Sequence, residues 1–277
     1  MIVKQTFTIT GAAGKPILMD LTYNNSAKTV DPLIIFVHGF KGFKDWGTHD
    51  LVADYFVENG FRYLKFNFSH NGTTIEHPTD FVDLGAFGDN TFSKEFEDLD
   101  QVITFALSGE SFQASEKVSL IGHSRGGGTC IIQAAKDERV DKLVTWAAIA
   151  DFSSLWKKEQ EDEWREKGVI YTYNVRTKQN TPLKIDLLND LEKHANGYNI
   201  LKCAAKIDKP WLLLHGDADQ NVALEDAQKL LNSNSKASLV VIKGADHVFG
   251  ASHPYPENDL PKQLLEVVEE SIAFVRS

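Results

Sequence analysis

Short apolar runs alternate with longer amphipathic stretches along most of this chain. Residues 33–37 and 118–121 are runs of the kind that form strands buried inside a sheet. Residues 50–59 and 92–107 instead carry apolar side chains at helical spacing. Because strands and helices alternate, the pattern predicts an α/β fold: a mostly parallel central sheet with helices on both faces.

The remaining elements of this sheet domain follow from the same two periodicities. Residues 5–10 and 17–23 flank a glycine- and proline-containing turn and predict an antiparallel hairpin at a sheet edge. Further strands are expected at 63–68, 142–150, 211–214 and 239–242, and further helices at 129–136, 224–232 and 261–275.

The alternation breaks between the strand at 142–150 and the strand at 211–214. Charged and polar stretches there predict a helix at 153–167, a small hairpin at 169–185 and a second helix at 186–195. We therefore expect a core made of residues 1–150 and 207–277. Residues 151–206 are expected to form an inserted cap or lid over the strand ends where ligands bind.

Composition and charge narrow the choice of partners. The 277 residues carry a net charge of −10, with no basic cluster, which argues against nucleic acid or an anionic membrane as a partner. No apolar leader and no run of about 18 apolar residues occurs, so we expect a soluble, cytoplasmic protein. Cys130 and Cys203 lie far apart and suggest neither a metal site nor a disulfide framework. Cys130 is expected in the core, no metal or cofactor is implied, and the oligomeric state is not predicted.

One motif carries the strongest chemical signal. Residues 122–126, Gly-His-Ser-Arg-Gly, fit the pattern G-x-S-x-G between a predicted strand and a predicted helix. This arrangement is a nucleophile elbow, which holds the serine hydroxyl at a strand end beside helix amides. The flanking glycines are expected because side chains there would collide with the neighbouring strand and helix. Ser124 is therefore the candidate nucleophile.

A serine nucleophile needs a base, and the base needs an orienting acid. His247 follows the last predicted strand and is the candidate base, with His253 as an alternative in a proline-containing loop. Asp219 is the candidate acid. Its rival Asp217 follows the same strand and is interpreted as a turn residue that binds nearby backbone amides.

The tetrahedral intermediate also needs fixed N–H donors. We assign these to the backbone amides of Phe40 and Arg125, and expect His38, Gly39 and His123 to lie near the substrate. The Arg125 side chain is expected on the surface. The acidic residues of the helix before the elbow are expected to form a solvated face: Glu95, Glu97, Asp98 and Asp100.

Substrate contacts are less readable. Four aromatic residues suggest an apolar or aromatic acyl pocket, although core packing explains them nearly as well: Phe40, Phe43, Trp46 and Trp156. The predicted cap also holds Trp164, Tyr171 and Tyr173. Together with Trp156, these either contact the substrate or attach the cap to the core.

These motifs together resemble the α/β-hydrolase superfamily across nearly the whole chain outside the cap. The resemblance rests on residues 37–40, 122–126, 215–219 and 246–247. Within the superfamily, the chain resembles the cinnamoyl (feruloyl) esterases and the serine-aminopeptidase-like hydrolases, on residues 66–69, 97–100 and the modest cap. His70 and Asn71 depart from the glycine that is usual after the fourth strand.

The resemblance and the residues imply a serine esterase that cleaves small carboxylic esters, with aryl or short-chain acyl groups, through an acyl-enzyme. A peptidase or amide hydrolase with the same residues is the second enzyme hypothesis. A binding protein that retained the fold without catalysis is the third. The intact Ser124, Asp219 and His247 argue against the last, because a scaffold alone needs none of them.

Overall fold

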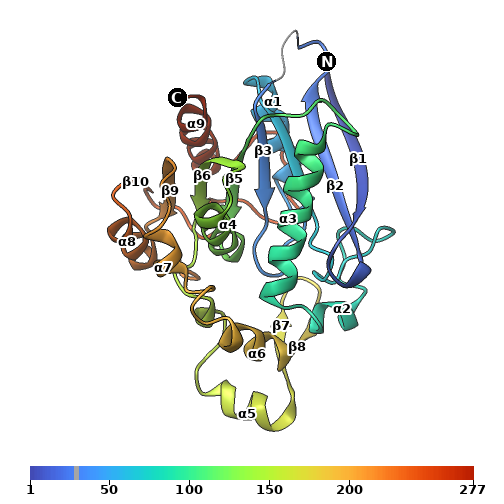
Figure 1. The fold of residues 1–277 in the computed structure, drawn as a ribbon, viewed down its shortest axis with the longest axis vertical. Helices are drawn as coiled ribbons and strands as arrows, with labels where there is room; N and C mark the ends of the chain where they lie inside the picture. The colour runs from blue at the N-terminus through green and yellow to red at the C-terminus, as the bar shows by residue number, and fades with distance from the viewer. Residues whose placement is uncertain (28–30) are drawn as a thin grey trace.

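An eight-stranded sheet runs through the computed structural model, which describes residues 1–27 and 31–277 (Figure 1). Its strand order is β1-β2-β4-β3-β5-β6-β9-β10. The first two neighbour pairs, β1–β2 and β2–β4, are antiparallel, and every other neighbouring pair is parallel. The strands are β1 (Ile2–Thr10), β2 (Pro16–Asn24), β3 (Leu33–Val37), β4 (Arg62–Phe66), β5 (Val118–His123), β6 (Val140–Trp146), β9 (Trp211–Gly216) and β10 (Ala237–Ile242).

Helices cover both faces of this sheet, as the buried central strands require. The pleat of β3 sends Ile34 and Phe36 into one core, with residues of α1 (His49–Glu58) and α9 (Lys262–Arg276). Leu33, Ile35 and Val37 face the other core, which contains α3 (Phe92–Ser108), α4 (Arg125–Lys136) and α8 (Leu224–Ser233). This two-faced burial confirms the predicted α/β class.

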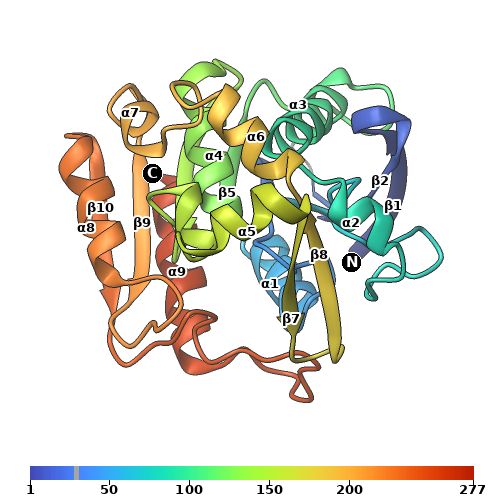
Figure 2. The same cartoon turned by 90° about the horizontal axis from the view of Figure 1, so that it is seen from below.

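The segment between β6 and β9 folds outside the main sheet. It contains η2 (Phe152–Leu155), α5 (Gln160–Lys167), the antiparallel pair β7 (Val169–Asn174) and β8 (Gln179–Lys184), α6 (Asp186–Lys193) and α7 (Ile200–Ala204). Most of it lies below the sheet in Figure 1, on the side to which the arrowhead of β3 points. Seen from below in Figure 2, α5, α6 and the β7–β8 hairpin lie between α4 and α2 (Leu84–Gly88).

Several predicted elements match the structure closely, and two do not. The edge hairpin is β1 and β2, joined by η1 (Ala12–Gly14), and β3 has the predicted bounds. The strand expected at 142–150 ends at Trp146, because the chain turns away at Ala147 (φ 48°) to pack against α4. The helix expected at 153–167 is interrupted, because Trp156 is extended between η2 and α5.

The acidic face predicted for α3 is wrong for two of its four residues. Glu95 and Asp98 are each only 1% exposed, whereas Glu97 and Asp100 are exposed. Asp98 accepts hydrogen bonds from the Ser69 and Ala12 amides, both at 2.8 Å, and so links α3 to the loop after β4 and to the edge hairpin. Burial raises the pKa of the Asp98 carboxyl to about 6.

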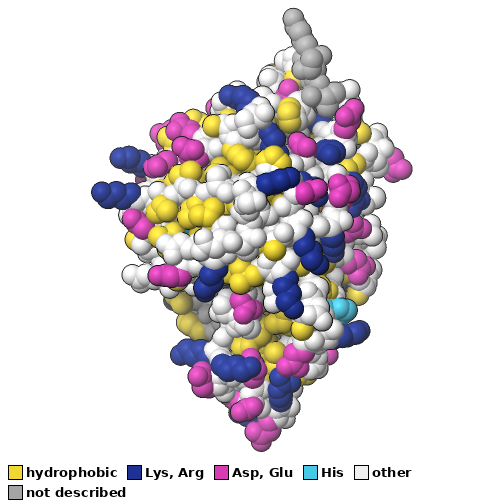
Figure 3. Space-filling model, turned by 60° about the vertical axis from the view of Figure 1, so that its left-hand side comes forward, with side chains coloured by type: hydrophobic (Ala, Val, Ile, Leu, Met, Phe, Trp, Pro, Cys, Tyr) yellow, Lys and Arg dark blue, Asp and Glu magenta, His cyan; other side chains and the backbone are white. Residues whose placement is uncertain are grey.

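The outer surface is charged and mixed. The face drawn in Figure 3 has Lys and Arg side chains interspersed with Asp and Glu rather than gathered into one basic patch. In the described part of the chain, no helix combines the length and the apolar character that a membrane crossing needs.

Candidate active site

Ser124 occupies the tight turn between β5 and α4, as the G-x-S-x-G motif predicts. Its backbone has φ 56° and ψ −121°, a conformation that non-glycine residues rarely adopt. Ser124 is the N-cap of α4, so its hydroxyl lies beside the positive end of the helix dipole. The side chain is nearly buried, with 8% of the residue exposed.

The flanking glycines are required by close approach. A Cβ on Gly122 would lie 2.5 Å from the Gly126 carbonyl oxygen and 2.7 Å from the Gly127 Cα. A Cβ on Gly126 would lie 2.3 Å from the Val37 carbonyl oxygen, at the end of β3. Both contacts are with backbone, which cannot move aside cheaply, so the collision inferred from the sequence is confirmed.

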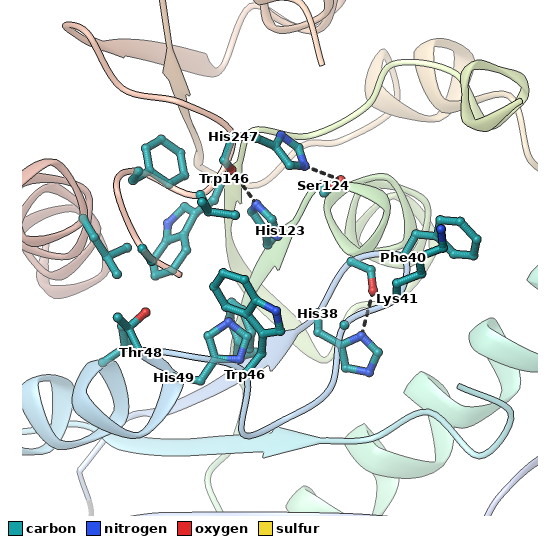
Figure 4. Close-up of a pocket in the computed structure, with 18 residues that line it drawn as sticks. His38, Phe40, Lys41, Trp46, Thr48, His49, His123, Ser124, Trp146 and His247 are labelled. Carbon is teal, nitrogen blue, oxygen red and sulfur yellow. Dashed lines mark hydrogen bonds between the residues drawn. The ribbon is translucent and has the colours of Figure 1, made fainter. Parts of the chain in front are cut away.

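Three predicted side chains from separate loops form one chain of hydrogen bonds. His247 Nε2 lies 3.0 Å from Ser124 Oγ, and His247 Nδ1 lies 2.8 Å from Asp219 Oδ2. Because a carboxylate accepts, Nδ1 carries the proton of the neutral ring, and Nε2 is left to accept the serine proton. Figure 4 shows His247 and Ser124 facing each other at the rim of a pocket.

Asp219 is held as a carboxylate. Burial alone would raise its pKa, but hydrogen bonds from His247 and from the Val222 and Asn221 amides outweigh burial and lower the pKa below its ordinary value. Its side chain is fully buried, and His215 Nε2 also approaches it at 3.5 Å. The charge is therefore available to orient His247 and to stabilise an imidazolium.

The two alternative residues lie elsewhere. Asp217 accepts a hydrogen bond of 2.6 Å from the Gly244 amide, the turn role that the sequence suggested. His253 Nδ1 accepts a hydrogen bond of 2.8 Å from the Gly47 amide and stacks against Trp46.

The loop after β3 lies directly against the serine. A Cβ on Gly39 would be only 3.0 Å from the Ser124 Cβ, so only glycine fits there without displacement. Phe40 follows in this loop, and Arg125 is the first residue of α4, whose N–H has no acceptor within the helix. Both candidate N–H donors therefore lie close to the serine: Phe40 follows Gly39, which packs against Ser124, and Arg125 follows Ser124 itself.

The Arg125 side chain is buried, which contradicts the surface position that we expected. It is 5% exposed and pairs with the carboxylate of Glu95 on α3. The sequence carried a signal for this: Arg125 begins a helix whose next residues are glycine, threonine, cysteine and isoleucine. All of them are buried, so a charge at the start of that helix needs a partner.

A pocket of about 150 Å³ opens beside Ser124 and His247 (Figure 4). Its apolar walls include Phe36 from β3, Trp146 from β6 and Phe249 from the loop after β10. The residues expected near the substrate that line it are His38, Gly39, Phe40, Trp46 and His123. Lys41, Thr48 and His49 also line it and were not predicted.

The buried rings of His38 and His123 beside this pocket are neutral. Burial lowers the pKa of His38 and His123 to about 4 and about 3. His123 Nε2 donates a 2.8 Å hydrogen bond to the His247 carbonyl, which fixes the loop that carries the candidate base. His70, which departs from the family pattern, is also buried, and its Nδ1 lies 2.8 Å from Ser69 Oγ.

Two aromatic residues do not reach the pocket. Phe43 is fully buried and packs edge-on against Phe81. Trp156 packs against the buried Trp164 ring, with centroids 5.3 Å apart, inside the segment 151–206. The contact favours the packing interpretation of Trp156 and Trp164, whereas Tyr171 and Tyr173 are more than half exposed.

Metal ligation has no support at this site. Among residues 1–27 and 31–277, no group of three or more His, Cys, Asp or Glu side chains is arranged to hold a metal ion. Cys130 and Cys203 are free and buried, Cys130 in the core beneath the elbow, as expected.

Parts of this chain match a family model and a curated protein. A family model for the alpha/beta hydrolase fold matches residues 32–167. A curated relative, an uncharacterized 31.7 kDa protein from the traX-finO intergenic region of Escherichia coli, is 31% identical over 134 residues. That match spans 48% of this chain and only 43% of the relative.

Solved structures match over almost the full chain at low identity. Est1E from Butyrivibrio proteoclasticus, solved with ferulic acid bound, has a TM-score of 0.74 at 18% identity and covers 98% of this chain and 100% of its own. The esterase domain of a Rhodothermus marinus protein has a TM-score of 0.67 at 20% identity, covering 99% and 98%. DcsB in complex with its substrate analogue has a TM-score of 0.75 at 16% identity, covering 99% of each chain. This chain therefore has the alpha/beta hydrolase fold, as both its sheet topology and the family-model match to residues 32–167 show.

Proposed function

We propose that this protein is a serine hydrolase that cleaves carboxylic esters through an acyl-enzyme. The observation that carries the proposal is the continuous set of hydrogen bonds from Asp219 to His247 to Ser124, at 2.8 and 3.0 Å. Esterases among the structural neighbours support the same reaction class, although at under 25% identity they share only the fold.

Each residue has one role in the proposed reaction. His247 Nε2 takes the Ser124 proton while Oγ attacks the ester carbonyl, and Asp219 stabilises the imidazolium. The tetrahedral oxyanion accepts hydrogen bonds from the Phe40 and Arg125 amides. Collapse of this intermediate expels the alcohol, which takes the proton from His247. A water molecule, deprotonated by the same ring, then releases the acid and restores Ser124.

The pocket beside Ser124 favours a small acyl group. A cavity of about 150 Å³ with aromatic walls suits a short aliphatic or single-ring aryl group better than a long chain. The proposed partner is therefore a small-molecule ester, and the proposed chemistry needs no metal or cofactor.

We assign residues 151–206 to a cap and residues 1–150 and 207–277 to the hydrolase core. Support comes from the position of the segment beyond the strand ends and from its own two-stranded sheet (Figure 2). Lys41, next to Phe40, donates to Thr172 Oγ1 and to the Tyr173 carbonyl, both at 2.9 Å, so the proposed cap directly contacts the loop beside the serine.

Hydrolysis of p-nitrophenyl acetate and butyrate tests the reaction. Ser124→Ala is expected to lower turnover by about 10⁶ if the three residues act as a unit. Ser119→Ala, on the same strand, is the matched control and is expected to retain activity. Near wild-type turnover by Ser124→Ala would refute the proposal. Turnover of matched p-nitroanilides with negligible ester turnover would favour an amide hydrolase instead.

A further inference from the structure

The Arg125 guanidinium is fixed from within the protein. It pairs with Glu95, which is 1% exposed, and the same Glu95 oxygen accepts a 2.7 Å hydrogen bond from Asn90 Nδ2. Arg125, Glu95 and Asn90 are all at least nine-tenths buried. The side chain that follows the serine is therefore anchored to α3 and to the loop before it.

The other side of this guanidinium lies over the Phe40 ring. The Arg125 Cζ is 4.7 Å from the ring centroid, within the range of a cation–π contact. Lys41 Nζ lies 5.3 Å from the same ring, and the Phe87 ring packs against it at 5.8 Å. The Arg125 guanidinium thus packs against the Phe40 ring, although Phe40 lies in the loop after β3 and Arg125 begins α4.

Packing alone does not require a charge here. Moving two charges out of water is expensive, and well-packed apolar side chains of similar volume often stabilise a protein as well or better. The Arg125–Glu95 ion pair is nevertheless present, and Arg125 directly follows the serine. Its guanidinium contacts Phe40, the other residue whose backbone amide we assign to the oxyanion. A contact between these two side chains constrains the spacing of their backbones.

We propose that the Arg125 side chain is a positioning residue: anchored by Glu95, it holds the Phe40 ring and thereby sets the spacing of the two amide N–H groups that receive the oxyanion. This inference rests on the proposed function. Oxyanion donors act only at short range, and a displacement of about 1 Å can cost about 10²-fold in rate. Disturbing the contact is therefore expected to slow turnover selectively while leaving substrate binding nearly unchanged.

The main variant is the double substitution Arg125→Met with Glu95→Leu, which removes both buried charges and leaves neither uncompensated. We expect kcat for p-nitrophenyl acetate to fall about 10- to 100-fold, with KM changed less than about 3-fold. Phe40→Leu removes the ring, keeps the ion pair and is expected to lower kcat to the same extent, so it carries the test if the double variant does not fold. Because Phe40 also lines the pocket, KM is compared only for the double variant.

A second readout separates positioning from general loosening of the structure. A trifluoromethyl ketone adds to a serine as an oxyanion, so its Ki should rise in proportion to the loss in kcat/KM across the variants. In the double variant, the Ki of the product acid should stay constant. Arg62→Met is the matched control. Arg62 is 7% exposed and lies over the Phe112 ring at 5.8 Å, away from Ser124, so this variant should lower the melting temperature and keep kcat.

The experiments distinguish failure of the positioning role from failure of the proposed hydrolase function. If Ser124→Ala hydrolyses the ester normally, the proposed function itself fails. If hydrolysis depends on Ser124 but the double variant and Phe40→Leu keep kcat and the ketone Ki within about 3-fold of wild type, the positioning role is overturned. In the double variant, an equal rise in Ki for the ketone and for the product acid would also overturn it.

Discussion

Asp219 accepts a 2.8 Å hydrogen bond from His247 Nδ1, whereas Asp217, only two residues earlier, binds the Gly244 amide. The two carboxylates follow the same strand and differ in which loop they hold. Asp219→Asn is expected to lower kcat by about 10⁴, because an amide can stabilise the wrong tautomer of His247 and cannot balance an imidazolium.

Asp217→Asn is the matched control for this prediction. Asp217 is exposed, so its substitution is expected to change unfolding free energy by only about 0.5 kcal/mol and to keep most of the activity. Steady-state kinetics of both variants with p-nitrophenyl butyrate decide between the carboxylates. A larger loss of kcat for Asp217→Asn would reverse the assignment.

The neutral histidines predict how stability changes with pH. The pKa of His38 falls to about 4 on folding, because the buried ring cannot easily hold a charge. Between pH 4 and the ordinary histidine pKa of about 6.5, the unfolded chain therefore binds more protons than the folded one, and stability rises with pH. The contribution of His38 is complete above about pH 6.5 and is lost as pH falls towards 4. His123, His49 and His70 act in the same direction, and Asp98 acts in the opposite one.

Denaturant unfolding of wild type and His38→Gln at pH 5 and pH 7 measures this contribution. Within the window, one such group changes the unfolding free energy by up to about 1.4 kcal/mol per pH unit. The variant is expected to depend less steeply on pH than wild type. Identical pH dependence in the two proteins would contradict a pKa of His38 that is lowered by burial.

The elbow glycines predict a steric effect. Gly126→Ala places a methyl group 2.3 Å from the Val37 carbonyl oxygen and 2.5 Å from that of His38. The backbone must shift, so we expect a loss of about 3 kcal/mol or more in unfolding free energy. Gly197→Ala is the control, because the nearest atom to its new methyl group is 3.7 Å away. Equal melting temperatures for the two variants would contradict this account of the turn.

Lys41 predicts a coupling between the loop after β3 and the β7–β8 hairpin. Its Nζ donates to Thr172 Oγ1 and to the Tyr173 carbonyl. Lys41→Met removes both bonds, each worth about 1 kcal/mol, so the β7–β8 amides should exchange their hydrogens about 5- to 30-fold faster. Lys167→Met, which removes only an exposed pair with Glu163 in α5, should leave this exchange unchanged. Unchanged exchange in Lys41→Met would show that other contacts hold the hairpin.

Much of the fold could be predicted because the sheet is buried on both faces. A strand such as β3 is then a continuous apolar run, and its ends coincide with the ends of the run. Ser124, Asp219 and His247 could be expected to lie close together because each follows a parallel strand, and parallel strands end at one edge of the sheet. The β6 boundary was missed because Ala147–Ala150 are as buried as the strand they follow.

The polar interior could not be predicted in the same way. Glu95 and Asp98 occupy helix positions that composition alone marks as solvated, and their burial depends on partners that are distant in sequence. Arg125 is 30 positions from Glu95, and the Ala12 amide is 86 positions from Asp98. Burial of a charged residue can be predicted from a sequence only when its partner is known. Here the partners come together only in the folded structure.

Labelling with a fluorophosphonate, followed by peptide mass spectrometry, tests the central claim most directly. The reagent phosphonylates a serine only when a neighbouring base and oxyanion donors activate it. We predict a single modified residue, Ser124, with labelling greatly slowed in His247→Gln. Absence of labelling, or a label on another serine with Ser124 unmodified, would contradict the account.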